Sequence, residues 1–306
     1  MVYTGQRRWI GGALFLVLLA LQPACLFSQK ARIGTTALLV EDVAKAAAKQ
    51  SDLRVIREGM PAYLMLIDGM VEGWPDKAEL LIAAAQAYSS FGAVLGDDKD
   101  KEYATLIAAK SRSYALKALV ARGFKDPLKS SFDDFARDVA ACGKKDVPYI
   151  FWAATCWANW IMLNLDSIEA MAELSRVELM VQKTLELDEG FYYGGPHLFM
   201  GVWFAARPAI AGGDLQKAKE HFLKAIDLGK GKFLMASVYY ADNYARRAQD
   251  KELFVSTLEK VLQTPADSVP ELTLLNTVAQ KKAKALLSRV KEYFEEEREN
   301  AKTNRY

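Results

Sequence analysis

The feature that most constrains the fold of this chain is a stripe of small and apolar residues that occurs four times. Within each stripe the residues stand at offsets of four and seven, and the four segments align without gaps. Such offsets place side chains on one face of an α-helix, where a partner helix can cover them. The stripes are Ser111, Ala115 and Ala118; Val177, Val181 and Thr184; Ala218, Phe222 and Ala225; and Phe254, Leu258 and Val261.

The four segments also resemble a known helical repeat. They start 66, 41 and 36 residues apart, and tetratricopeptide repeats have a period of 34 residues. Ala218, Phe222 and Ala225 are similar to the second helix of that repeat, and residues 81–88 match the spacing of its first helix. A lysine occupies the same column of every segment, at Lys117, Lys183, Lys224 and Lys260. The resemblance implies degenerate tetratricopeptide repeats with insertions.

Helical periodicity continues through almost the whole chain after Gln29, and alternating strand patterns are absent from the sequence. The last predicted helix has one apolar face and an acidic end, which suits a capping helix; a membrane-binding helix is the alternative, but acidic residues disfavour an anionic surface. We predict an all-α, tetratricopeptide-like superhelix of about a dozen helices with a C-terminal capping helix. The predicted helices span residues 36–49, 52–71, 77–94, 100–121, 131–142, 148–164, 167–187, 196–206, 215–228, 233–247, 251–263 and 271–298.

The N-terminus has the layout of a secretory signal. Arg7 and Arg8 precede an apolar run over residues 9–21, which is shorter than the roughly 20 apolar residues of a transmembrane helix. The Ala24-Cys25 pair that follows resembles the cleavage site of bacterial lipoproteins. That resemblance implies that Cys25 is lipidated and tethers the chain to a membrane. The alternatives are an ordinary signal peptide or an uncleaved anchor.

These signals define the predicted organisation of the chain. Residues 1–24 form a lipoprotein-type signal peptide, residues 25–34 a tether, residues 35–299 a single helical-repeat domain and residues 300–306 a disordered tail. We therefore expect an exported, periplasmic protein that is lipid-anchored to a bacterial membrane, either inner or outer. Cys142 and Cys156 could pair in an oxidising compartment, but we interpret them as buried apolar residues.

Composition argues against several classes of function. The net charge is +2, from 40 Lys and Arg against 38 Asp and Glu, so the chain lacks the basic footprint of a nucleic-acid binder. His197 and His221 are the only histidines, too few for a His-rich metal site or a His-based triad. The sequence contains no hydrolase elbow, zinc-protease, dithiol or phosphate-loop motif. We predict that the protein is not an enzyme and needs neither metal nor cofactor, and we interpret His221 as structural.

Aromatic residues concentrate in three predicted helices, those over residues 148–164, 196–206 and 233–247, and just before the second of them. The first helices of tetratricopeptide folds line a concave surface, so aromatic side chains with polar tips there predict a ligand cavity or a partner groove. The alternative is that these side chains pack between repeats. The candidate residues are Tyr149, Trp152, Asn159, Trp160, Tyr193, His197, Trp203 and Tyr240.

Several separated segments resemble one particular family. They are residues 57–69, 77–88, 146–160, 190–197, 212–222 and 240–241, so that the resemblance covers about residues 34–290. The family is TatT, the lipoprotein component associated with some tripartite ATP-independent periplasmic (TRAP) transporters. The resemblance implies a tethered accessory protein that binds the periplasmic solute-binding protein of such a transporter. It also implies an internal cavity for a hydrophobic organic acid, and it leaves a homo-oligomer open.

Two other classes of function remain open from the sequence. One is a helical-repeat lipoprotein that scaffolds envelope or outer-membrane protein assembly through a peptide groove. The other is a helical-solenoid cell-wall hydrolase, which would need a catalytic domain that no remaining segment supplies.

Overall fold

The computed structural model describes residues 42–95 and 101–296. The chain divides into two units, residues 1–46 and 47–306. Of the first unit only residues 42–46 are described, and they belong to a short helix over residues 42–48. The predicted signal peptide, Cys25, the tether and the C-terminal tail lie outside the described residues.

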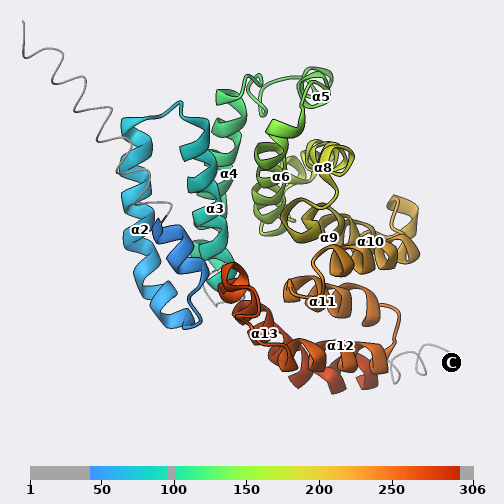
Figure 1. Ribbon diagram of the computed structural model, residues 1–306. Helices are drawn as coiled ribbons and strands as arrows, with labels where there is room; N and C mark the ends of the chain where they lie inside the picture. The colour runs from blue at the N-terminus through green and yellow to red at the C-terminus, as the bar shows by residue number, and fades with distance from the viewer. Residues whose placement is uncertain (1–41, 96–100, 297–306) are drawn as a thin grey trace, which may run out of the picture. The chain divides into compact units, whose positions relative to one another are not determined.

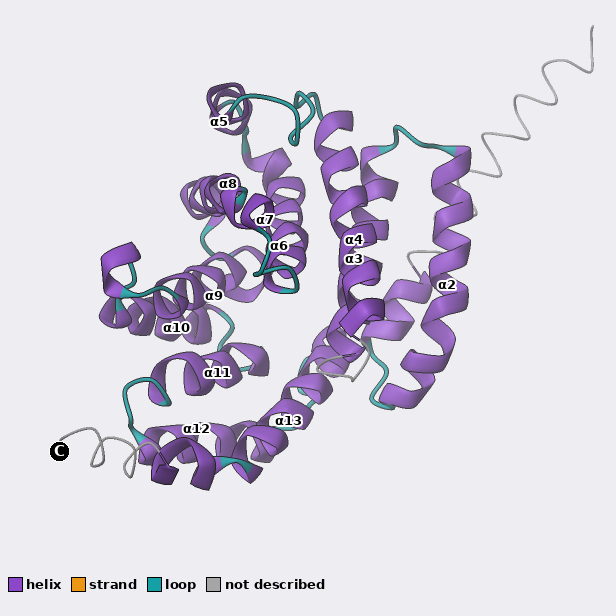
Figure 2. Cartoon of the chain, turned by 180° about the vertical axis from the view of Figure 1, so that it is seen from behind, coloured by secondary structure: helices purple, strands orange, loops and turns teal. Residues whose placement is uncertain are grey.

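The second unit is built from helices, and its described residues contain no strand (Figures 1 and 2). This confirms the predicted all-α helical fold. The α-helices are α2 (Leu53–Gly73), α3 (Ala78–Leu95), α4 (Lys101–Ala121), α5 (Phe132–Ala140), α6 (Val147–Met162), α7 (Ile168–Ala172), α8 (Leu174–Asp188), α9 (Phe191–Ala206), α10 (Leu215–Leu228), α11 (Leu234–Tyr240), α12 (Lys251–Gln263) and α13 (Thr273–Ser288).

Helices that are close in the sequence pack against each other. Helix α3 packs between α2 and α4, α4 packs on α6, α6 on α8, and α9 on α10; α11, α12 and α13 form the last group. Helix α13 also contacts α2. The predicted stripes explain this order, because all twelve of their residues are buried. The lysine column lies beside the stripe, where its side chains are exposed or half-buried.

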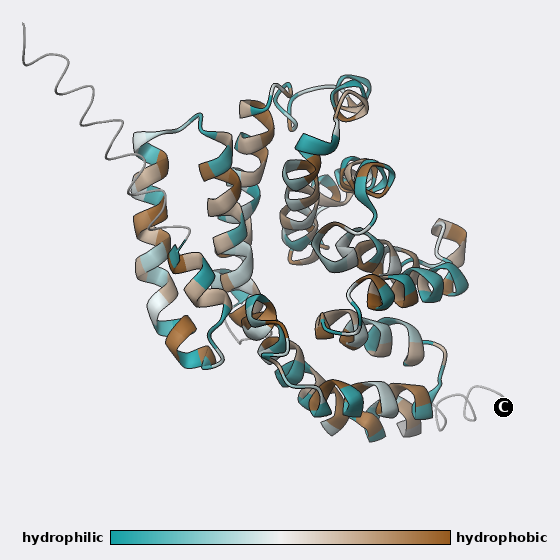
Figure 3. Cartoon of the chain, in the orientation of Figure 1, coloured by the Kyte–Doolittle hydropathy of each residue, from teal (hydrophilic) through white to brown (hydrophobic). Residues whose placement is uncertain are grey.

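One described helix, α3, is long and apolar enough to cross a membrane by length and composition. It carries apolar residues along its length (Figure 3), and most of it is buried against α2, α4 and α6. Within the unit it is therefore a core helix.

Cys142 and Cys156 are buried, free thiols, as the sequence predicts, and burial raises the pKa of each to about 11.

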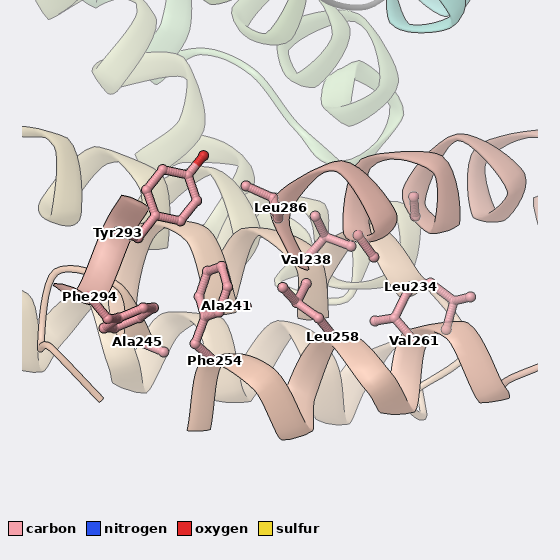
Figure 4. Packing of buried hydrophobic residues seen from close by; sticks show 12 residues of the cluster. Leu234, Val238, Ala241, Ala245, Phe254, Leu258, Val261, Leu286, Tyr293 and Phe294 are labelled. Atoms are coloured by element: carbon pink, nitrogen blue, oxygen red, sulfur yellow. The ribbon is translucent and has the colours of Figure 1, made fainter. Parts of the chain in front are cut away.

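The C-terminal group has its own apolar core (Figure 4). Phe254, Leu258 and Val261 of α12 pack with Leu234 and Val238 of α11 and with the apolar face of α13. The prediction of one helix over residues 271–298 is wrong within the described part, because α13 ends at Ser288 and a π-helical turn covers Glu292–Glu296. The wider turn changes the helical phase, which allows Tyr293 and Phe294 to pack edge-on against Phe254.

Two other predicted helices are interrupted in the structure. The helix predicted over residues 167–187 divides at Glu173 into α7 and α8, and the Glu173 carboxylate accepts hydrogen bonds from Arg112 and Trp157. The helix predicted over residues 233–247 changes at Ala241 into a π-helical segment, Ala241–Ala245. Helix caps follow the sequence more closely, since the Asp214 carboxylate accepts from the backbone N–H groups of Gln216 and Lys217.

The buried side-chain amide of Asn276 forms hydrogen bonds with three backbone groups in the C-terminal part of the chain. Asn276 of α13 is fully buried; its Oδ1 accepts from Leu234 N at 3.0 Å, and its Nδ2 donates to Lys232 O and Ala266 O, both at 3.0 Å. We expect Asn276→Leu to lower the free energy of unfolding by about 3 kcal/mol, because three backbone groups lose their partners. Urea unfolding measures the loss. Asn164→Ala, which removes a single hydrogen bond to Trp160 O, should cost no more than about 1 kcal/mol; equal losses would contradict the assignment.

Candidate functional site

The start of α9 has an unusual backbone. Tyr192 (φ 48°), Tyr193 (φ 59°) and Gly194 (φ 79°) are consecutive residues in the left-handed region. Glycine adopts that conformation freely, but each tyrosine pays about 1–2 kcal/mol for it. Such strain persists only where the surrounding packing imposes it, and it is concentrated at ligand sites and switch regions. The turn is therefore the first indication of a functional surface.

Close contact between α9 and α10 holds this turn in place. A Cβ atom at Gly194 would lie 3.0 Å from Ala225 Cα, and one at Gly201 would lie 2.7 Å from Cδ1 of Phe222. Phe222 and Ala225 belong to the buried stripe of α10. A residue larger than glycine at position 194 or 201 would therefore clash with this stripe. The left-handed turn at the start of α9 brings Gly194 into contact with α10.

The turn directs its two tyrosines into a set of aromatic rings, which we call the aromatic cluster. Trp152 and Tyr192 meet edge to face, with ring centroids 4.8 Å apart, and Phe233 contacts both tyrosines at 6.0 Å. Phe151 and Phe233 are buried, and the other four rings are half-buried. The members are Phe151, Trp152, Phe191, Tyr192, Tyr193 and Phe233.

The aromatic cluster is a surface of rings with polar tips. Burial raises the pKa of Tyr192 to about 12, so its hydroxyl stays protonated and can donate a hydrogen bond. Half-buried aromatic rings with such hydroxyls can hold an apolar molecule and orient one polar group on it. This arrangement suits binding and offers no nucleophile or general base.

The two histidines of the chain meet beside this turn. Nδ1 of His197 on α9 lies 2.9 Å from Nδ1 of His221 on α10, so one ring donates and the other accepts. Nε2 of His197 lies 3.1 Å from Glu189 Oε2, and the other Glu189 oxygen is 3.3 Å from Lys224 Nζ. His221 stacks on Phe204. Burial, with a smaller contribution from His197, lowers the pKa of His221 below its ordinary value.

A second polar arrangement joins α4, α6 and the start of α8. The guanidinium of Arg112 lies 3.9 Å from the ring centroid of Trp160 and 5.1 Å from that of Trp157. Its Nη2 is 2.5 Å from Glu173 Oε2, which also accepts from Trp157 Nε1 at 2.5 Å. The Trp160 ring thus stacks on the guanidinium of Arg112 between α4 and α6.

The remaining candidates lie at other helix junctions. Tyr149 Oη donates to Glu79 Oε1 of α3 at 3.4 Å, and Asn159 Nδ2 donates to Ser89 Oγ of α3 at 3.4 Å. Trp203 Nε1 donates to Glu178 Oε1 of α8 at 3.1 Å. Tyr240 is buried and stacks on Tyr244 with ring centroids 5.2 Å apart.

The structure therefore brings only two of the eight candidates, Trp152 and Tyr193, into one cluster, with His197 a few residues further along α9. That the eight line one cavity stays a prediction. Two surface grooves lie elsewhere: one of ≈ 250 Å³ along α4 and the loop after it, and one of ≈ 360 Å³ between the start of α4 and the loop after α6.

Sequence reasoning missed several residues of these arrangements. Arg112 and Glu173 carry no local signal, because their pairing depends on how α4 meets α8. Tyr192 had a signal in the segment Tyr192-Tyr193-Gly194-Gly195-Pro196, since paired glycines before a proline indicate a turn. Across residues 42–95 and 101–296 no group of three or more His, Cys, Asp or Glu residues is placed to hold a metal ion.

The fold defines a class of protein, an all-α helical-repeat protein, and this one carries a cluster of half-buried aromatic rings. Residues 49–294 match the family described as TRAP transporter T-component, and the chain belongs to that family. The resemblance to TatT seen in the sequence is thereby confirmed. A protein of Treponema pallidum (strain Nichols), described as uncharacterized, is 20% identical over 270 residues, which cover 83% of this chain and 84% of that protein.

The histidine pair predicts a pH dependence of stability. Because the pKa of His221 is lowered in the folded state, the unfolded chain takes up a proton more readily, and stability should fall as the pH drops below about 6.5. Glu220 acts in the opposite direction on His221 and limits the size of the effect.

His221→Phe keeps the stacking on Phe204 and removes the titrating ring. We expect it to flatten the loss of melting temperature between neutral pH and pH 5, measured by circular dichroism. Leu223→Phe, at an exposed position on the same helix, serves as the control and should retain the slope of the unaltered protein. An unchanged slope in His221→Phe would assign the acid sensitivity to other groups.

Proposed function

We propose that this protein is a membrane-tethered, periplasm-facing accessory component of a TRAP transporter. In this role it binds the periplasmic solute-binding protein of the transporter and holds an apolar organic acid against the aromatic cluster. Membership of the T-component family supports the transporter role. The signal-like residues 1–24 and Cys25 support export and tethering.

The observation that carries the ligand proposal is the left-handed turn at Tyr192 and Tyr193. The two strained residues are stabilised by packing, yet Trp152, Phe191 and both tyrosines remain half-buried. A turn that served packing alone would gain by burying those rings fully, at about 25 cal/mol per Å² of apolar surface. Rings that are preorganised and left accessible are suited to a ligand that completes their burial.

The partner and the tether can be tested in one experiment. The tagged protein is expressed in its own envelope together with a TRAP solute-binding protein, solubilised in detergent and captured. We expect the unaltered protein in the membrane fraction, with the solute-binding protein present in stoichiometric amount.

Cys25→Ser is the matched variant for the tether. We expect it to lose labelling by a radioactive fatty acid, because the thiol that would carry the lipid chains is gone, while it still captures the solute-binding protein. Labelling equal to that of the unaltered protein would contradict lipidation at Cys25. Capture of envelope-assembly proteins in place of the solute-binding protein would favour the scaffold alternative.

The aromatic cluster is tested with Trp152→Leu. This change keeps an apolar side chain at the position but removes the ring that packs against Tyr192. We expect it to weaken binding of a hydrophobic aryl acid by about tenfold, since one ring–ring contact contributes about 0.5–1.5 kcal/mol beyond its area. Isothermal titration measures the affinity, and density of the soaked acid beside Trp152 locates it.

Trp74→Leu is the control for this experiment. Trp74 follows α2 and is half-buried, so its removal changes the tryptophan content without touching the aromatic cluster. Equal weakening by both variants, or binding that neither affects, would remove the aromatic cluster from ligand recognition.

A further inference from the structure

The two histidines of the chain meet within the closest part of the contact between α9 and α10. On α9, His197 stands between Gly194 and Gly201, the two glycines that lie directly against α10. The Nδ1 atom of His197 is 2.9 Å from the Nδ1 atom of His221 on α10. The histidine contact therefore belongs to the same helix–helix packing as the left-handed turn, which ends at Gly194 one helical turn before His197.

The distance between the two Nδ1 atoms leaves room for one proton. One Nδ1 must carry the hydrogen and the other must present its lone pair. This condition is met when both rings are neutral, and it is still met after one proton is added, because that proton binds to a free Nε2 atom. A second added proton has only an Nδ1 atom left to occupy, so that two N–H groups would point at each other. Two imidazolium rings therefore cannot keep this contact.

Neither ring can turn away from the other without losing a further contact. Nε2 of His197 lies 3.1 Å from Glu189 Oε2, and the His221 ring stacks on Phe204 with ring centroids 5.5 Å apart. Both imidazole rings are half-buried, so water gives a pair of like charges less relief than it would at an exposed site. The second proton therefore acts against the packing of α9 on α10.

The charged groups around the pair favour the first proton and not the second. Among the described residues, these groups come from the end of α8 and from α10. Glu189 faces His197, and its other oxygen lies 3.3 Å from Lys224 Nζ. Glu220 raises the pKa of His221, but burial and His197 together lower it by more, so that this pKa lies below its ordinary value.

The left-handed turn is able to respond when the histidine contact is lost. Tyr192 and Tyr193 have φ angles of 48° and 59°, which are strained for residues other than glycine and persist only where the surroundings impose them. Gly194, the next residue, is in contact with α10. Once α9 separates from α10 at this point, both tyrosines are free to return to the right-handed region.

We propose that the His197–His221 pair is a proton-operated latch that holds the start of α9 against α10 and opens in acid. Binding of the second proton separates the two rings, and the turn that carries Tyr192 and Tyr193 relaxes. The open form binds one proton more than the closed form, so acid favours it below about pH 6.5, the ordinary pKa of histidine. The same opening would release a ligand from the aromatic cluster, a consequence that rests on the proposed function.

Hydrogen exchange of the purified, ligand-free full chain tests the latch. Exchange is followed by mass spectrometry at about pH 7.5 and 5.5, with exchange times scaled for the intrinsic pH dependence of amide exchange. We expect the opening constant over residues 190–200 to rise about tenfold in acid, because opening takes up one proton. Peptides from α3 and α13 should keep their protection. No ligand is present, so failure of the latch and failure of the proposed function are separate results.

His221→Asn and Leu223→Asn form the matched pair of variants. Asparagine places an amide near the position of the imidazole Nδ1, where it pairs with His197 and takes up no proton. We expect residues 190–200 of His221→Asn to be equally protected at both pH values. Leu223 is exposed on the same helix, so Leu223→Asn should open in acid as the unaltered protein does.

Three exchange results would overturn the proposal. Equal protection of residues 190–200 at both pH values would show that the turn does not respond to acid. An equal loss of protection in α3 and α13 would show that acid destabilises the whole unit. An acid response that survives in His221→Asn would assign it to other groups. If that variant does not fold, NMR titration of the unaltered protein decides: two imidazoles that both titrate at or above about pH 6.5 would contradict a closed pair that excludes the second proton.

Discussion

The contact on which the rest of the structure depends is the burial of one helical stripe against the next helix. Every member of the four stripes is buried, and Phe222 and Phe254 are completely so. A fully buried phenylalanine contributes about 3–5 kcal/mol when compared with alanine. Because each stripe is only three residues long, the facing helix must approach closely, and the glycines of α9 are the consequence.

Close helix packing also determines where polar groups can lie. The stripes place apolar residues between paired helices, and buried or half-buried ionic groups lie beside the stripes or where helices meet. Arg112, Glu173 and Trp157 occupy one such junction, and the His197–His221 pair, at the contact of α9 and α10, continues through Glu189 to Lys224. At these places aromatic rings fill space and guanidinium or imidazole groups lie on their faces.

Much of the fold was predictable from the sequence because the stripe is a local signal. Residues at offsets of four and seven share a face whatever the rest of the chain does, so the burial of Val177 or Leu258 follows from the sequence alone. The positions at which predicted helices divide or change to a π-helix were not predictable. The π-helical turn over Glu292–Glu296 exists because Tyr293 and Phe294 reach Phe254, and that contact joins segments about 40 residues apart.

For the candidate site, the sequence could predict only which helices are rich in aromatic residues. Aromatic density indicated α6 and α9, but it could not distinguish Trp152, which joins the aromatic cluster, from Trp160, which stacks on Arg112. Both stand on α6, where their offset of eight residues separates them by about 80° around the axis of an ideal helix. What separates them is the partner at each end, α9 for Trp152 and α4 for Trp160. Charge pairing was hidden for the same reason, since Arg112 and Glu173 are 61 positions apart.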